Sequence, residues 1–186
     1  MPQADASDAA IRADSFPLNS FLPADSLGIV DLALQARGTG FDPLLPRTRT
    51  SLRAQIDRAE FGGRDFGGIE LDAELDSQRL SGRISDRDEA LRLLLSVSGT
   101  LTEREQRIGL SGSVFGFDLA ALGVSPEPIG GSFALDASAS AAGKGAYAAR
   151  IALDSIEIRN KHRTDRIRPT SVSLHTDSAA TRAEAA

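Results

Sequence analysis

Apolar and polar residues alternate with a period of two along most of the chain. The clearest stretch is IELDAEL at 69–75, in which every second residue is apolar and the residues between are carboxylates. Such alternation places successive side chains on opposite faces of a β-strand. The same pattern recurs at 31–38, 52–56, 91–101 (broken only at Leu94), 132–139, 147–153 and 171–174. One apolar and one polar face per strand is typical of an antiparallel sheet with one wetted side.

Glycine-rich segments separate these stretches and predict turns, because glycine supplies the positive φ that tight turns need. They lie at 38–40, 62–63, 67–68, 111–113 (SGS) and 143–145. Helix signals are scarce, and only single turns are expected at 17–23, 41–46 and 119–122, the last capped by Asp118 and stopped by Gly123. We therefore expect an all-β fold, a repetitive antiparallel bent sheet with one or two single-turn helices.

An internal repeat relates the two halves of the chain. FPLNSFLPADSLGIVDLAL and FDLAALGVSPEPIGGSFAL share one order of features: an apolar turn, a proline corner, glycine and a strand. Later in each half, IDRAEF at 56–61 and LDSIEI at 153–158 shift the alternation by one residue, which predicts a bulge or tight bend. We expect a linker or disorder over 1–16, a first β-repeat over 17–116 and a second, truncated repeat over 117–186.

Composition narrows the functional classes. Hydrophobic residues make up 41% and charged residues 25% of the 186, as in ordinary folded chains. The net charge of −5 argues against nucleic acid as a partner, because phosphate binding needs a concentrated basic surface. The chain has no cysteine, so disulfides and thiolate metal sites are excluded. No apolar run approaches a membrane span and no signal peptide is visible, so we interpret the chain as a fragment whose targeting and anchoring segments lie elsewhere.

The residues that could take part in catalysis, metal binding or headgroup binding have simpler structural explanations. His162 and His175 match no ligand spacing, and the GLSGSVFG segment lacks a GxSxG nucleophile motif. The carboxylates Glu70, Asp72 and Glu74 suit a soluble outer face better than catalysis or calcium binding. The basic run RNKHRTDRIR at 159–168 suits a solvated hairpin loop better than a site for anionic lipid headgroups. We therefore expect no enzyme activity, no metal and no cofactor.

The apolar sides of the predicted strands leave two alternatives. They form either an ordinary core between two sheets or the lining of an open groove. The residues concerned are Leu71, Leu93, Leu95, Phe133, Leu135, Ile151, Leu153, Ile156 and Val172.

The run FDLAALGVSPEPIGGSFALDASASAAGKG resembles the repeating element of the AsmA-like superfamily, most closely the TamB-type envelope proteins. FPLNSFLPADSLGIVDLALQARGTG resembles the same element one repeat earlier. The resemblance implies a folded-over sheet, the β-taco, with a hydrophobic groove along its length. It also implies the periplasm of diderm bacteria as the location, in a full-length protein anchored in the inner membrane.

The function implied by this resemblance is phospholipid transport between the inner and outer membranes in support of outer-membrane biogenesis. The nine apolar residues would then line the groove, and each shielded acyl methylene would contribute roughly 0.8 kcal/mol. Implied partners are phospholipid and an outer-membrane β-barrel assembly protein. The alternative is a structural scaffold for outer-membrane protein assembly that binds no lipid.

Overall fold

The computed structural model describes residues 7–17, 27–40, 42–61, 64–143, 146–176 and 181–185, and strands dominate these ranges. Thirteen strands are present: β1 (Ser7–Pro17), β2 (Leu27–Thr39), β3 (Arg49–Phe61), β4 (Arg64–Phe66), β5 (Ile69–Asp76), β6 (Arg79–Arg87), β7 (Leu91–Leu101), β8 (Glu105–Asp118), β9 (Gly130–Ala142), β10 (Ala146–Arg159), β11 (Thr164–Ile167), β12 (Thr170–Thr176) and β13 (Thr181–Ala185). None of the described segments forms a helix long and apolar enough to cross a membrane.

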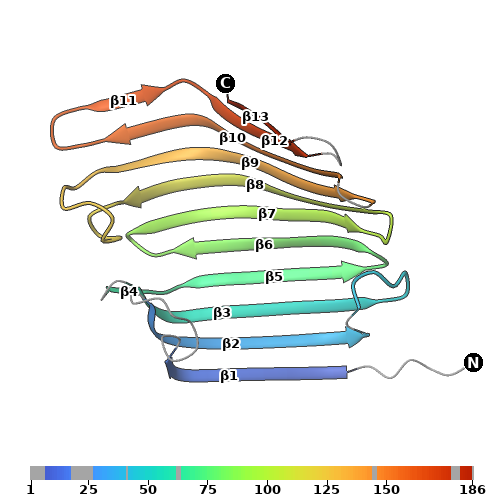
Figure 1. The fold of residues 1–186 in the computed structure, drawn as a ribbon. Coiled ribbons are helices and arrows are strands. Elements are labelled where there is room, and N and C mark those ends of the chain that lie inside the picture. The colour runs from blue at the N-terminus through green and yellow to red at the C-terminus, as the bar shows by residue number, and fades with distance from the viewer. Residues whose placement is uncertain are drawn as a thin grey trace, which may run out of the picture.

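All strands belong to one antiparallel sheet whose spatial order follows the chain (Figure 1). The short strands β4 and β11 are side branches that pair with the ends of β3 and β10. This up-and-down topology follows from local connections, because both the tight hairpin between β5 and β6 and the longer turn between β8 and β9 bring the chain back beside the preceding strand. The predicted all-β, bent antiparallel sheet is confirmed.

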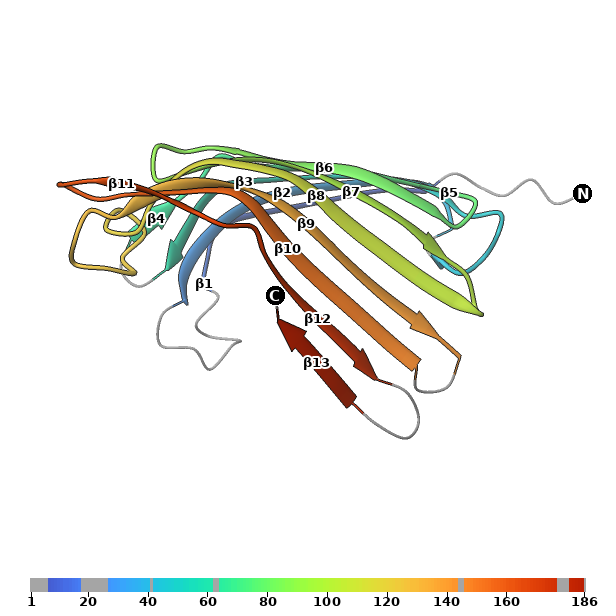
Figure 2. The same cartoon turned by 90° about the horizontal axis from the view of Figure 1, so that it is seen from above.

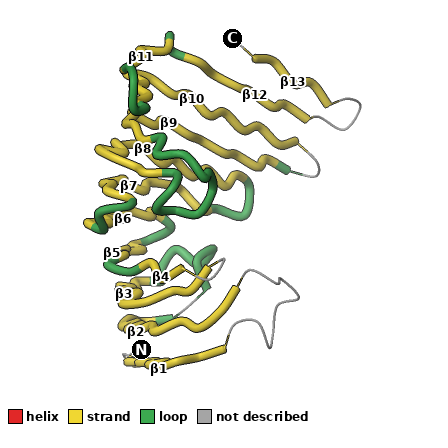
Figure 3. Tube along the Cα trace, turned by 90° about the vertical axis from the view of Figure 1, so that its left-hand side faces the viewer, coloured by secondary structure: helices red, strands yellow, loops and turns green. Residues whose placement is uncertain are grey.

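The sheet is an open arc. In Figure 2 the strands near the C-terminus curve out of the plane of β5 to β7, and Figure 3 shows the arc along the strands. Extensive contacts join only hydrogen-bonded neighbours, so no second layer packs on either face of the described sheet. The chain exposes 12870 Å², whereas a compact monomer of 19.6 kDa exposes roughly 8,600 Å². The predicted alternative of a filled core between two sheets is therefore not what forms.

The structure repeats its own strand arrangement. Strands β1 to β5 and β8 to β12 follow the same plan, in which a short side strand branches from the third member. Register shifts occur at matching places: after Ala13 and Val114 between the first two strands, and near Asp31 and Asp154 between the next two. The expected bulge in 153–158 is present, since Ser155 adopts a φ of 52° within β10. The repeat therefore begins at a strand, one element before the boundary expected at 117.

Several sequence-based expectations need correction. Residues 1–16 were expected to be a linker, but 7–17 form strand β1, whose apolar Ala9 and Ile11 pair with β2. Strands β6 and β8 carry many small residues that weaken the alternation, and the SGS segment expected as a turn lies inside β8. The expected single-turn helices are wrong for the described residues, in which no helix forms. Residues 119–122 and 42–48 form hydrogen-bonded turns only, the first with the Leu122 amide donating to the Asp118 carbonyl at 2.9 Å. The turn expected at 17–23 lies almost wholly outside the described residues.

We expect Gly112→Ala to lower the free energy of unfolding by about 2 kcal/mol, because Gly112 has a φ of 151° that L residues rarely adopt. An added Cβ would also lie 2.2 Å from the backbone oxygen of Leu94. Gly109→Ala in the same strand is the matched control, since its Cβ would meet nothing closer than the Ser98 hydroxyl at 3.3 Å. Urea unfolding of both variants tests this, and equal losses would contradict the backbone explanation.

Candidate apolar groove

The register of the sheet joins the apolar residues of successive strands into continuous rows. Apart from the side strands β4 and β11, every strand from β1 to β12 contributes an apolar residue or a glycine to each row, at a position that pairs directly with the next strand. One row consists of Ala9, Ala36, Leu52, Ala73, Gly82, Val97, Leu110, Ala137, Ile151 and Val172. At a strand spacing of about 4.8 Å, ten strands span about 43 Å. We call the side of the sheet that carries these rows the apolar face.

A second row runs beside the first and consists of Ile11, Leu34, Ala54, Leu71, Ile84, Leu95, Gly112, Leu135 and Leu153. Neither row contains a charged residue. The glycines are low points in the rows, because they add no side chain to the surface. Together the rows form an uninterrupted apolar band across the strands.

All nine residues proposed from the sequence lie on this apolar face. Leu71, Leu95, Leu135 and Leu153 belong to the second row, and Ile151 and Val172 to the first. The paired residues Leu93, Val114 and Phe133 form a third, shorter row. Ile156 follows the bulge of β10 and pairs with Ile167. The structure therefore brings together on one face residues that are up to about 100 positions apart in the sequence.

Burial of these residues is only partial. Leu95 and Ile156 are 8% exposed, whereas Ile151 and Val172 are 53% and 50% exposed. Only five apolar residues are buried in the described chain: Val30, Ala36, Leu95, Val114 and Ile156. Monomeric soluble proteins rarely leave so large a contiguous apolar surface open, and such surfaces mark binding sites.

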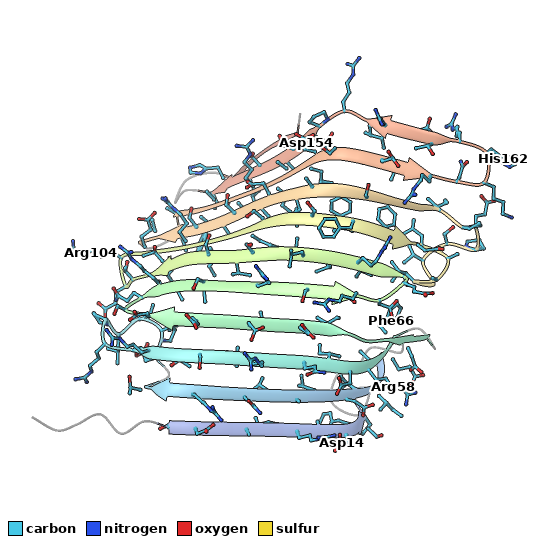
Figure 4. The ribbon with its side chains drawn as sticks, turned by 180° about the vertical axis from the view of Figure 1, so that it is seen from behind. Asp14, Arg58, Phe66, Arg104, Asp154 and His162 are labelled. Atoms are coloured by element: carbon cyan, nitrogen blue, oxygen red, sulfur yellow. The ribbon has the colours of Figure 1, made fainter. Side chains whose placement is uncertain are left out.

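Curvature explains which side of each strand is better shielded. Along β5 and β7 the apolar residues are half-buried or buried and the residues between them are exposed, although no layer covers either face. Side chains on the inside of a bend converge and shield one another, while those on the outside spread apart. Figure 4 views the outer side of the arc and shows nitrogen- and oxygen-bearing side chains in front of the strands. The apolar face therefore lines the concave side of the arc.

Bulges preserve this arrangement along the longest strands. In β8 two residues, Phe115 and Gly116, stand between Val114 and Phe117, so that both of the flanking side chains stay on the apolar face. The rings of Phe117 and Phe133 lie 6.1 Å apart at 56°, a tilted contact that is favourable for aromatic pairs. These rings lie beside the apolar band on β8 and β9.

The opposite face of the sheet, which we call the charged face, carries cross-strand ion pairs. Arg53 donates to Asp72 at 2.7 Å, and Arg49 donates to Asp76 at 2.9 Å. Glu70, Asp72 and Glu74 all lie on this face, as the alternation predicts. These pairs are largely exposed, so each contributes little to stability. Their main effect is to keep this face compatible with water.

Asp86 is an exception on the apolar face that the sequence pattern did not reveal. It pairs with Leu93 and is 5% exposed. Its Oδ1 accepts the Asp88 amide at 2.8 Å, and Asp88 in turn accepts the Ala90 amide at 2.7 Å. Burial raises the pKa of Asp86 above its ordinary value, despite these amide hydrogen bonds. Asp86 thus orders the β6–β7 turn at an electrostatic cost.

This raised pKa predicts a pH effect. Between the ordinary value of 3.8 and the raised value, the folded chain binds more protons at Asp86 than the unfolded chain, so stability falls as pH rises through that window. Asp86→Asn keeps the acceptor oxygen and removes this cost. We expect its stability relative to wild type to increase from about pH 3 to about pH 7 in urea titrations.

Asp76→Asn is the control of opposite sign. The Ser77 hydroxyl, and then Arg49, lower the pKa of Asp76, so its contribution is present above the ordinary pKa and lost as pH falls. If the stabilities of Asp86→Asn and Asp76→Asn, each relative to wild type, changed in the same direction with pH, the raised pKa of Asp86 would be contradicted.

The remaining candidates stay apart. His162 lies in the β10–β11 turn and His175 on β12, where it pairs with Ala148. Within the described ranges, no three His, Asp or Glu side chains are close enough to hold a metal ion. The basic run forms the β10–β11 hairpin, in which Arg163 contacts Asp165 at 2.7 Å. Figure 4 shows His162 and Arg104 at opposite ends of the strands.

Comparison with models of known protein families gives no match. Searches of curated proteins and of solved structures likewise find nothing similar to this chain.

Proposed function

We propose that this chain is a periplasmic segment of a TamB/AsmA-like protein, and that its apolar face shields phospholipid acyl chains during transport between the inner and outer membranes. The proposal is supported by the uninterrupted apolar band on the concave side of the sheet, which no second layer covers. Acyl chains are a suitable occupant because they need area and no specific polar contact. Each methylene removed from water contributes roughly 0.8 kcal/mol.

The repeated strand plan supports the same proposal. Because β8 to β12 repeat β1 to β5 within one sheet, the apolar rows pass from one unit to the next without a break. A chain of such units would extend the groove in proportion to its length. Transport over a distance needs a continuous path of this kind, whereas storage of one ligand needs only an enclosed cavity.

Photo-crosslinking tests the proposal directly. We expect photoreactive residues at Leu93, Leu135 and Ile151 to capture phospholipid from phosphatidylethanolamine–phosphatidylglycerol vesicles. Ser138 and Arg150, on the charged face of β9 and β10, are matched control positions and should capture none. Capture of protein alone at the groove positions would favour the alternative of a lipid-free scaffold for outer-membrane protein assembly.

A further inference from the structure

Strand β1 is one outer edge of the sheet, because it pairs with β2 on one side and with no described strand on the other (Figure 1). Almost all of its residues are exposed. An open edge presents backbone amides and carbonyls without partners, and these groups are a template for pairing with another strand. The edge of β1 is therefore a candidate interaction surface.

The first seven residues of β1 are well suited to accept another strand. They pair with β2 in one unbroken register, and the irregular part of β1 begins only after Ala13. Exposed edge strands are commonly protected from pairing by proline, by a bulge or by shortness. Residues 7–13 contain neither proline nor a bulge, and they are as long as an ordinary strand.

The charges on this edge favour a second copy of the same strand as the partner. Asp8 and Arg12 lie on the charged face, at equal distances along the strand on either side of Ala10. If two β1 strands run antiparallel about a two-fold axis at Ala10, each Asp8 stands directly opposite Arg12 of the other copy. Opposite charges in directly paired positions attract, and like charges repel.

Other antiparallel registers of β1 with itself lack this match. Directly paired side chains share one face, so the two-fold axis must pass through a residue and not between two residues. An axis at Asp8 or at Arg12 pairs like charges, and an axis at Ile11 pairs Asp8 with Asp14. An axis at Ala13 requires pairing beyond that residue, where β1 is irregular. Axes nearer the start of the strand leave Arg12 unpaired.

The ion pairs already present extend the match on both sides. Arg37 Nε donates to Asp8 Oδ2 at 3.0 Å, and Arg12 Nε donates to Asp14 Oδ1 at 3.1 Å. In the described chain these contacts leave Oδ1 of Asp8 and the terminal nitrogens of Arg12 for the second copy. Positive and negative side chains would then alternate across the interface. Such a network contributes more than isolated exposed ion pairs do.

We propose that two copies of this chain associate through antiparallel pairing of their β1 strands over residues 7–13, which joins the two sheets into one. The two-fold axis is perpendicular to the sheet, so the apolar faces of both copies lie on the same side. Ala9 of each copy pairs with Ile11 of the other, so the first apolar row of one copy continues into the second row of its partner. Ile11, which is 59% exposed in a single copy, gains an apolar neighbour.

The association depends on β1 and not on what occupies the groove. It is measured without lipid, whereas acyl-chain crosslinking at Leu135 reports on the groove alone. Failure of the dimer and failure of the lipid proposal are therefore distinguished.

Sedimentation equilibrium of the whole chain over a wide range of concentration tests the proposal, and we expect a monomer–dimer equilibrium. Asp8→Arg and Arg12→Asp should each weaken dimerisation at least about tenfold, because each variant places like charges opposite one another. Mixed in equal amounts, the two variants should form a heterodimer, in which every opposed pair again carries opposite charges. Arg53→Asp, a charge change on interior strand β3, is the control and should dimerise like the wild type.

A disulfide tests the register. The chain has no cysteine, so a single introduced thiol forms a disulfide only between copies. Under mild oxidation Ala10→Cys, which lies on the axis, should give a covalent dimer. Ala13→Cys should not, because the two thiols would stand about 20 Å apart, beyond the reach of a disulfide.

A chain that stays monomeric, a dimer that both charge variants preserve, or charge variants that do not associate when mixed would each overturn the proposal. Equal crosslinking at positions 10 and 13 would do the same. Circular dichroism establishes that each variant is folded. If a charge variant does not fold, the two cysteine variants still decide whether the β1 strands pair.

Discussion

We expect the replacement of Leu135 with arginine to reduce the proposed acyl-chain binding at least tenfold. Leu135 stands in the second row between Gly112 and Leu153, so a cation there interrupts the apolar band on β9, before its last strands β10 and β12. Covering that cation with hydrocarbon requires its desolvation, which costs several kcal/mol, whereas a tenfold loss requires only about 1.4 kcal/mol. Titration with a fluorescent fatty acid measures the effect.

Ser138→Arg is the matched control, because it adds the same charge to the same strand on the opposite face. It should bind the fatty acid like the wild type. If Leu135→Arg proves unstable, Ile151→Arg replaces it, since Ile151 is already 53% exposed and tolerates a long side chain. Equal binding by the groove variants and Ser138→Arg would end the lipid proposal.

Ser155→Pro has the largest expected effect on stability, a loss of more than about 3 kcal/mol. Ser155 is the extra residue of the β10 bulge and has a φ of 52°. Because proline fixes φ near about −65°, it cannot adopt the conformation of the bulge, and the pairing of β10 with β9 would break there. Urea unfolding monitored by circular dichroism measures the loss.

Ser155→Gly keeps the bulge and provides the contrast. A φ of 52° is unfavourable for serine and free of strain for glycine, so this variant should be at least as stable as the wild type. A proline variant as stable as Ser155→Gly would show that β10 does not need the positive φ of Ser155.

Much of the sheet could be predicted from sequence because alternation is a local property. Residues 69–75 form a strand whose faces are those the pattern indicates, and the shift after Leu153 is the predicted bulge. Strands β6 and β8 escaped notice because serine and glycine occupy many of their positions and blur the contrast between faces. β1 escaped for a similar reason, since alanine supplies much of its apolar side.

Alternation assigns the nine groove residues to one face of the sheet. It does not predict whether a second layer covers that face. A covered core and an uncovered groove require the same alternating pattern, and only curvature and the absence of a second layer distinguish them. Asp86 was missed because its single carboxylate interrupts an apolar face that is otherwise regular.

The restriction of extensive contacts to neighbouring strands has a thermodynamic consequence. Without a shared core, strands far apart in the sheet are coupled only through those between them, so cooperativity is short-ranged. Unfolding should therefore proceed by fraying inward from β1 and β13, with amide hydrogen exchange slowest in β7 to β9. Unfolding would then be gradual and begin at the edge strands, in contrast to the single cooperative transition of a globular domain.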